Sequence, residues 1–267
     1  MSRTSVARTL DLNADLGEGV AADGLTDAEL DAALLEVVTS ANVACGGHAG
    51  DDGSMARVCS TAVERGVAIG AQVSYVDREG FGRRRLDVDP ATLVEQILEQ
   101  LGSLRAHARS AGGRVAYLKP HGALYNAAAD DPAVADAVVR AVLADSEDHR
   151  QLPVLTLPGC ALALRARAAG IEVVAEAFAD RAYTATGRLV PRSEPGAVID
   201  DPHEVVLRVL RMEADHRVRT VDGGDVGVEP RSICLHSDTD GALDLARRVR
   251  HALWAAGVLL IPFSGVR

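Results

Sequence analysis

Residues 115–126 read Val-Ala-Tyr-Leu-Lys-Pro-His-Gly-Ala-Leu-Tyr-Asn, an apolar strand followed at once by charged and turn-forming residues. Pro120 and Gly122 predict a tight turn after the strand rather than a helix. Lys119 is the single lysine among the 28 basic residues of the chain, all the others being arginine. Lysine at this one position favours a role for a compact ammonium whose pKa can shift, which a guanidinium cannot supply. We therefore predict that Lys119 is catalytic, and the alternative is an ordinary ion pair with a nearby carboxylate.

Short apolar strands alternate with longer helical segments along the whole chain, which predicts a parallel sheet. Three helices are expected to begin at the Asp-Pro pairs 89–90, 131–132 and 201–202, because aspartate caps free amides and proline suits the first helical position. Two more are expected from Thr26-Asp27 and from about Thr239 toward Ala256. The seven strands we expect are Thr9 to Asn13, Ser40 to Ala44, Val67 to Ala71, Val115 to Leu118, Val154 to Leu157, Glu172 to Ala175 and Ser232 to Leu235.

Length and composition favour one domain over residues 1–267. The chain is 48% hydrophobic and contains no linker-like stretch, and a single α/β barrel takes roughly 250 residues. The net charge of -10 argues against nucleic acid as a partner. Neither a long apolar run nor an apolar signal core in residues 1–10 is present, so no membrane association is expected and the cytoplasm is the expected location. The four cysteines form no CxxC pair and are expected to be free thiols.

Polar side chains follow the carboxyl ends of the predicted strands, where parallel α/β folds build their ligand sites. Lys119 and His121 follow one strand, and Asp15 and His48 follow two others. We predict that these four residues are catalytic and share one pocket. The alternative is that polar residues simply appear wherever strands leave the core. The long connection from Ala177 to Asp200 is expected to cover the site.

The remaining assignments are less specific. Asp15, His48 and Asp51 could bind a divalent metal together with His121 or His236, since histidine and carboxylate suit zinc and similar ions, although no diagnostic ligand spacing is present. Alternatively, Asp15 and His48 could relay protons during amide hydrolysis. The side chains that we expect to bind substrate are Asn13, Asn42, Asp51, Gln72, Glu176 and His236.

Several long motifs resemble the LamB/YcsF family, whose bacterial members include the A subunit of 5-oxoprolinase. They are Asp11-Leu-Asn-Ala-Asp-Leu-Gly-Glu-Gly19, Ser40-Ala-Asn-Val-Ala-Cys-Gly-Gly-His-Ala-Gly-Asp51, Gly80-Phe-Gly-Arg-Arg84, Lys119-Pro-His-Gly-Ala-Leu-Tyr-Asn126 and Ile233-Cys-Leu-His-Ser-Asp238. The resemblance implies a distorted β/α barrel, similar to glycoside hydrolases and deacetylases. It also implies opening of 5-oxo-L-proline to L-glutamate, with ATP and magnesium and with 5-oxoprolinase subunits B and C. In that reaction, Lys119 would hold the carbonyl oxygen.

Two positions depart from the pattern of that family. Gln72 stands where the family usually has histidine, and Gly47 stands where it has phenylalanine. A neutral amide neither takes up protons near pH 7 nor binds metals strongly, and Gly47 is expected to open space for a larger ligand. A different lactam is therefore one alternative. A metal-dependent amidohydrolase of the deacetylase type and a non-catalytic subunit that binds a small acid are two others.

Overall fold

The computed structural model describes residues 8–145, 150–238 and 241–264. Within these residues, a parallel barrel is closed by pairing of β1 with both β2 and β9. Its strands, in the order in which they pair, are β1 (Thr9–Leu16), β2 (Ser40–Ala44), β3 (Ala68–Val73), β4 (Val115–Pro120), β5 (Val154–Thr156), β6 (Val173–Phe178) and β9 (Ser232–Leu235). All seven predicted strands are therefore present in the barrel, which confirms the predicted fold class.

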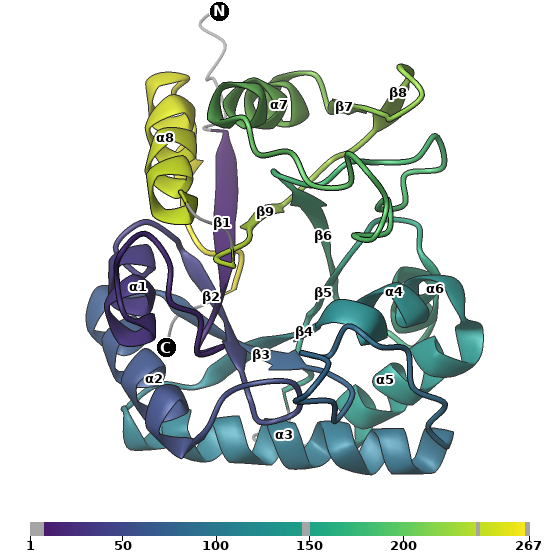
Figure 1. Ribbon diagram of the computed structural model, residues 1–267. Helices are drawn as coiled ribbons and strands as arrows, with labels where there is room; N and C mark the ends of the chain where they lie inside the picture. Colours follow the sequence, from purple (N-terminus) through teal and green to yellow (C-terminus); the bar gives the residue numbers. More distant parts are fainter. Residues whose placement is uncertain (1–7, 146–149, 239–240, 265–267) are drawn as a thin grey trace, which may run out of the picture.

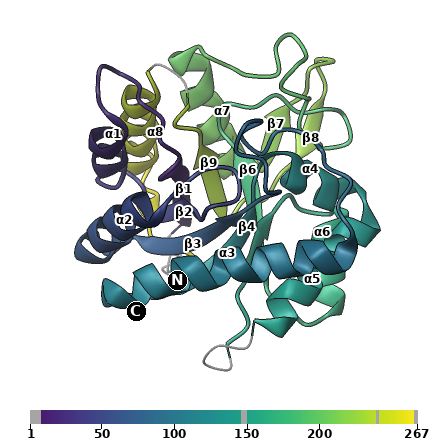
Figure 2. The same ribbon diagram turned by 60° about the horizontal axis from the view of Figure 1, so that its bottom comes forward.

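The helices lie around the outside of the barrel (Figures 1 and 2). They are α1 (Asp27–Leu34), α2 (Asp52–Arg65), α3 (Pro90–Ser110), α4 (Gly122–Asp130), α5 (Pro132–Ala144), α6 (Ala161–Ala168), α7 (Pro202–Ala214) and α8 (Ala242–Ala255). The three predicted Asp-Pro starts are confirmed, since in each the aspartate side chain accepts from the next turn's amides. No helix in the described ranges has the length and apolar character needed to cross a bilayer.

Some elements differ from the prediction. The turn expected at Pro120 and Gly122 is wrong, because β4 runs through Pro120 and α4 begins directly at Gly122. The antiparallel pair β7 (Arg217–Arg219) and β8 (Asp225–Gly227) was not expected. Nor was β10 (Leu259–Leu260), which pairs with the start of β1. The expected start of the last helix at Thr239 lies outside the described residues.

The barrel interior is polar along β1, because the residues of this strand that point inward are Asp11, Asn13 and Asp15. Leu12, Ala14 and Leu16 belong to the main apolar cluster, whereas Asp11, Asn13 and Asp15 hydrogen-bond to side chains of neighbouring strands. In the layer nearest the strand starts, the hydroxyls of Thr39 and Ser40 each donate to Asp11 Oδ1 over 2.6 Å. The Ser232 hydroxyl donates to the other oxygen. Along this strand, polar side chains that hydrogen-bond to one another thus fill the interior in place of apolar side chains.

Tyr117 crosses the interior above Gly70. A Cβ atom built on Gly70 would lie 2.1 Å from ring atoms of Tyr117. The ring of Tyr117 fits in this position only because Gly70 has no side chain. The hydroxyl of Tyr117 donates to Asn42 Oδ1 over 2.7 Å. Phe263 packs on the ring, with centroids 4.8 Å apart.

Replacing Gly70 with alanine is expected to displace Tyr117 and break its bond to Asn42. Overpacking of a core costs about 1–3 kcal/mol, so the free energy of unfolding should fall by that amount in urea titrations. Gly102→Ala is the matched control, because the site in α3 is open and alanine should stabilise the helix by about 0.5–1 kcal/mol. Equal stability of the two variants would contradict the close packing.

The buried carboxyl group of Asp11 should make the stability of the protein depend on pH. Burial raises its pKa from 3.8 to about 6, against the lowering effect of its three hydroxyl donors. A raised folded-state pKa contributes stability that is present below the unfolded pKa and lost as pH rises through about 6. The difference in the free energy of unfolding between Asp11→Asn and the wild type should therefore shift by about 3 kcal/mol in favour of the variant from about pH 4 to about pH 8. The exposed Asp87→Asn control should show no such trend.

Candidate active site

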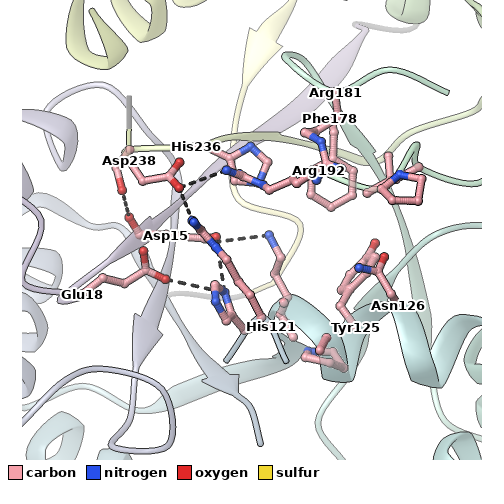
Figure 3. A pocket seen from close by; sticks show the side chains of 18 of the residues that line it. Asp15, Glu18, His121, Tyr125, Asn126, Phe178, Arg181, Arg192, His236 and Asp238 are labelled. Carbon is pink, nitrogen blue, oxygen red and sulfur yellow. Dashed lines mark hydrogen bonds and ion pairs between the residues drawn. The ribbon is translucent and has the colours of Figure 1, made fainter. Parts of the chain in front are cut away.

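A pocket of about 470 Å³ opens at the carboxyl ends of the strands (Figure 3). The residues that line it come from β1, β4, β6 and α4, from the loops after β1, β6 and β9, and, in the case of Arg83, from the loop after β3. The connection 177–200 contributes Arg181 and Arg192 to the lining of the pocket. The predicted convergence of polar residues is therefore present in the structure.

Lys119 lies at the floor of the pocket with 2% of its surface exposed. Its Nζ atom is 2.7 Å from Glu176 Oε1 and 3.4 Å from Asp15 Oδ1. It also lies 3.2 Å from both Asn13 Oδ1 and Cys234 Sγ. Burial alone would lower the pKa of Lys119, but its anionic surroundings, above all Asp15, raise that pKa well above the usual value. The side chain is therefore a fixed ammonium, and the pKa shift disfavours a role as a nucleophile or base.

The pKa values of the two carboxylates that hold Lys119 shift in opposite directions. The pKa of Asp15 is raised by burial but lowered further by Lys119, His236 and His121, so the net shift is downward and Asp15 is ionised. Burial raises the pKa of Glu176, although Lys119 and the Tyr125 hydroxyl stabilise its charged form. Asn42 Nδ2 donates to Asp15 over 2.8 Å and to Asn13 over 2.6 Å. The Lys119 ammonium is thus held by an interior network that begins at Asp11.

A second polar group lies beside this one. Glu18 Oε1 is 3.0 Å from His48 Nε2 and 3.6 Å from His121 Nδ1. The two imidazole rings are stacked, with centroids 3.7 Å apart and planes 10° from parallel. Phe81 meets both rings edge-on. Burial lowers the pKa of His121 well below its usual value, which keeps that ring neutral.

Arginines surround the mouth of the pocket. Arg192 Nη1 is 3.0 Å from Asp238 Oδ2, and Arg83 pairs with the same oxygen. His236 Nδ1 lies 2.9 Å from each oxygen of Asp180, and Figure 3 shows His236 beside Arg192. Two guanidinium groups therefore share one carboxylate at the entrance.

Most of the predicted site residues lie at or directly beneath the pocket. Asp15, Lys119, His121 and His236 line it. Asn13, Asn42 and Glu176 lie in the hydrogen-bond network below, and His48 and Gln72 stand behind the lining residues. Cys45 is buried, and burial raises the pKa of its thiol, so it serves packing, as expected. All four cysteines are free.

Asp51 is the exception, and the structure does not place it among the residues that line the pocket. It is the exposed N-cap of α2, and its carboxylate accepts from the Ser54 amide over 2.8 Å. The aspartate belongs to a helix start, and the serine three residues later is the signal that identifies this role.

Several lining or contacting residues were not predicted to act in the site, among them Glu18, Arg83 and Cys234. Glu18 follows Gly17, whose φ of +73° turns the chain at the end of β1. Its position between two glycines after a strand was a usable signal. Arg83 and Cys234 lie in two of the family motifs, but their positions did not indicate a contact with the site, because one lies in a loop and the other reads as an apolar strand residue.

Among the residues that the structure describes, two sets of side chains have donor atoms close enough for a metal, each within 4.8 Å: Glu18 with His48 and His121, and Asp15 with Cys234 and His236. In the first set, an ion would have to lie in the plane of both imidazoles, and two rings stacked almost in parallel cannot direct their nitrogens at one point. In the second set, the Lys119 ammonium already contacts Asp15 and Cys234. Neither set fits a resident metal in this arrangement.

The two departures from the family pattern are accommodated differently from what was expected. Gln72 Nε2 lies 2.9 Å from His121 Nδ1, so the amide supports a histidine of the site. A Cβ atom on Gly47 would lie 2.4 Å from Ser74 Oγ and 2.5 Å from Gln100 Oε1. The expectation of extra space at Gly47 is therefore wrong, because Gln100 from α3 fills it and binds the backbone of Ser74.

Comparisons with known proteins agree with this geometry. The 5-oxoprolinase A subunit of Streptomyces avermitilis is 56% identical over 96% of this chain and 100% of its own length. The homologue of the same name from Streptomyces coelicolor is also 56% identical over the same shares. The crystal structure of a lactam utilization protein from Thermus thermophilus matches with a TM-score of 0.85 at 40% identity, covering 96% of this chain and 100% of that one.

A putative cellobiose-phosphate cleavage protein from Enterococcus faecalis V583 shares the fold alone, with a TM-score of 0.54 at 13% identity, covering 96% of this chain and 97% of that one. The model of the LamB/YcsF family matches residues 10–267. This match spans the barrel and every residue of the pocket, and the chain belongs to the LamB/YcsF family.

Proposed function

We propose that this chain is one subunit of a 5-oxoprolinase, which opens 5-oxo-L-proline to L-glutamate at the expense of ATP and together with partner subunits B and C. The observation that carries the proposal is 56% identity, over nearly the full length of both chains, to relatives named as the A subunit of 5-oxoprolinase. Their designation as one subunit supports action within a complex. The name of the Thermus relative, a lactam utilization protein, supports a lactam as substrate.

The chemistry of the pocket suits a small anionic lactam. Arg83 and Arg192 both pair with Asp238 at the entrance, so two cations meet one carboxylate and the mouth has positive charge to offer the ring carboxylate. Lys119 at the floor is a desolvated ammonium, held from below, and is suited to stabilise negative charge on the carbonyl oxygen. Coupling to ATP through phosphorylation of that oxygen would make a stable amide a better target for water.

Glutamate and ADP release from 5-oxoproline plus ATP tests the proposal. The chain is assayed alone and then mixed with its two partner subunits. We expect turnover only in the mixture. Absence of glutamate in a mixture in which the Streptomyces avermitilis homologue restores activity would contradict the proposal.

Lys119→Met is expected to lower the rate of glutamate release in the mixture by roughly 100-fold or more, because one electrostatic donor to a developing oxyanion is worth about that much. The substitution also leaves Asp15 and Glu176 without their cation, which costs about 3–5 kcal/mol of stability for a buried pair. The double variant Lys119→Met/Glu176→Gln should recover part of the stability and none of the activity.

Arg57→Met is the control, since it removes an exposed cation on α2 that does not line the pocket. Its activity should equal that of the wild type. Turnover by a folded Lys119→Met protein at the wild-type rate would remove the lysine from the mechanism. Circular dichroism and the unfolding midpoint establish that each variant is folded.

A further inference from the structure

We infer that Glu18 and His48 share one proton, and that Glu18 donates it to the ring nitrogen of the lactam as the carbon–nitrogen bond breaks. The inference builds on the proposed function and adds a catalytic residue to it. It follows from counting the hydrogens between four neighbouring groups, namely Tyr75, Ser74, His48 and Glu18.

The protonation of His48 on one side is fixed by Ser74. The hydroxyl of Ser74 donates to the backbone carbonyl of Tyr75 over 2.9 Å. Its oxygen is therefore free only to accept from His48 Nδ1, which lies 3.0 Å away. Because a hydroxyl has a single hydrogen, Nδ1 of His48 must carry the proton of that contact.

The other nitrogen of His48 then faces Glu18. Nε2 is 3.0 Å from Glu18 Oε1, and both side chains are buried, with exposures of 0% and 4%. If neither atom carried a proton, a lone pair would meet a carboxylate without a hydrogen between them, which is costly in a buried site. One proton therefore lies between Nε2 and Oε1.

His121 is excluded as a second donor of this kind. Its Nε2 atom lies 3.2 Å from the backbone carbonyl of Phe81, which can only accept, so Nε2 carries the hydrogen. The ring is neutral, which makes Nδ1 an acceptor, and the Gln72 amide donates to it over 2.9 Å. His121 is thus a fixed, neutral wall beside Glu18. The Gln72 amide favours the neutral form of His121, and this form needs no ionisable group at position 72.

Glu18 is the member of the pair that reaches the ligand. It lines the pocket, and its whole residue, backbone included, is 9% exposed, whereas the His48 residue is 1% exposed and lies behind it. Figure 3 shows the Glu18 carboxyl group directed at His121 beside the pocket. Glu18 is therefore the catalytic residue, and His48 is a positioning residue that holds its proton.

The charged groups around the pair are Asp15 on β1, Lys119 at the end of β4, Asp238 after β9 and Arg83, which pairs with Asp238. Burial raises the pKa of Glu18, the hydrogen bond with His48 lowers it, and the charges of Asp15 and Asp238 raise it again. The net shift is upward. These surroundings favour a carboxyl group that keeps its proton.

Once ATP has activated the carbonyl oxygen as proposed, ring opening needs one water and the proton shared by Glu18 and His48. The phosphoryl group stays on that oxygen until a second water releases it as phosphate. Water forms a bond from its oxygen to the carbonyl carbon, and the electrons of the carbon–nitrogen bond move to nitrogen as that bond breaks. The nitrogen takes the proton of the pair and becomes the amine of glutamate. The hydroxyl proton brought by the attacking water then returns to the pair, which restores the starting state.

The first experiment measures glutamate release by the full mixture of subunits as a function of pH, for the wild type, Glu18→Gln and Glu79→Gln, an exposed control. A proton donor is lost at high pH, so kcat/KM of the wild type should fall as pH rises. Glu18→Gln should lose about 100-fold or more in kcat, and its remaining activity should lack that fall. His48→Gln should move the fall to higher pH, because His48 lowers the pKa of Glu18.

A flat pH profile of the wild type, or a folded Glu18→Gln protein that keeps the wild-type kcat and the same pH profile, would overturn the inference. Failure of the wild-type mixture to form glutamate would instead count against the proposed function. If the wild-type mixture forms no glutamate, a second measurement still tests whether Glu18 and His48 share a proton. Nitrogen-15 spectra of the chain alone, with His48 assigned from a His48→Asn variant, should show Nδ1 protonated and an Nε2 signal that changes in Glu18→Gln. Protonation of His48 at Nε2 alone would refute the shared proton.

Discussion

The ion pairs between Lys119 and two buried carboxylates are the interaction on which the rest of the site depends. An ammonium that is 2% exposed is tolerable only beside compensating charge, and Glu176 at 2.7 Å and Asp15 at 3.4 Å supply it. The carboxylates are held in turn by Asn42 and Tyr125. The polar side chains inside the barrel therefore hold the Lys119 ammonium in place, and the hydrogen bonds around Asp11 continue this network toward the strand starts.

The strands and the position of the site were predictable from the sequence because apolar runs and the polar residues after them are local signals. β7 and β8 were missed because each contains a single apolar residue, unlike the equally short but apolar β5, and β10 was missed because it has only two residues. Asp51 was misplaced because the direction of a side chain at a helix start depends on the cap that it forms. Glu18 gained its importance only from His48, which comes 30 residues later in the chain.

Gln72 and Gly47 show why substitutions at a site are best judged with their neighbours. Gln72 keeps a hydrogen bond to His121, and Gln100 fills the volume beside Gly47 while binding Ser74 through both ends of its amide. Ser74 in turn fixes His48. Two residues that look like losses in the sequence are thus joined to the same pair of histidines through short chains of contacts.

The contrast between floor and rim limits how such a pocket can diversify. Each side chain of the floor holds another in place, from Asn13 and Asn42 to Lys119, so a change there disturbs several hydrogen bonds at once. The rim is built from the loop that carries Arg83 and from the connection 177–200, whose exposed parts take part in few such hydrogen bonds. Descendants of this barrel that acquire new ring substrates should therefore differ at the entrance while inheriting the same floor.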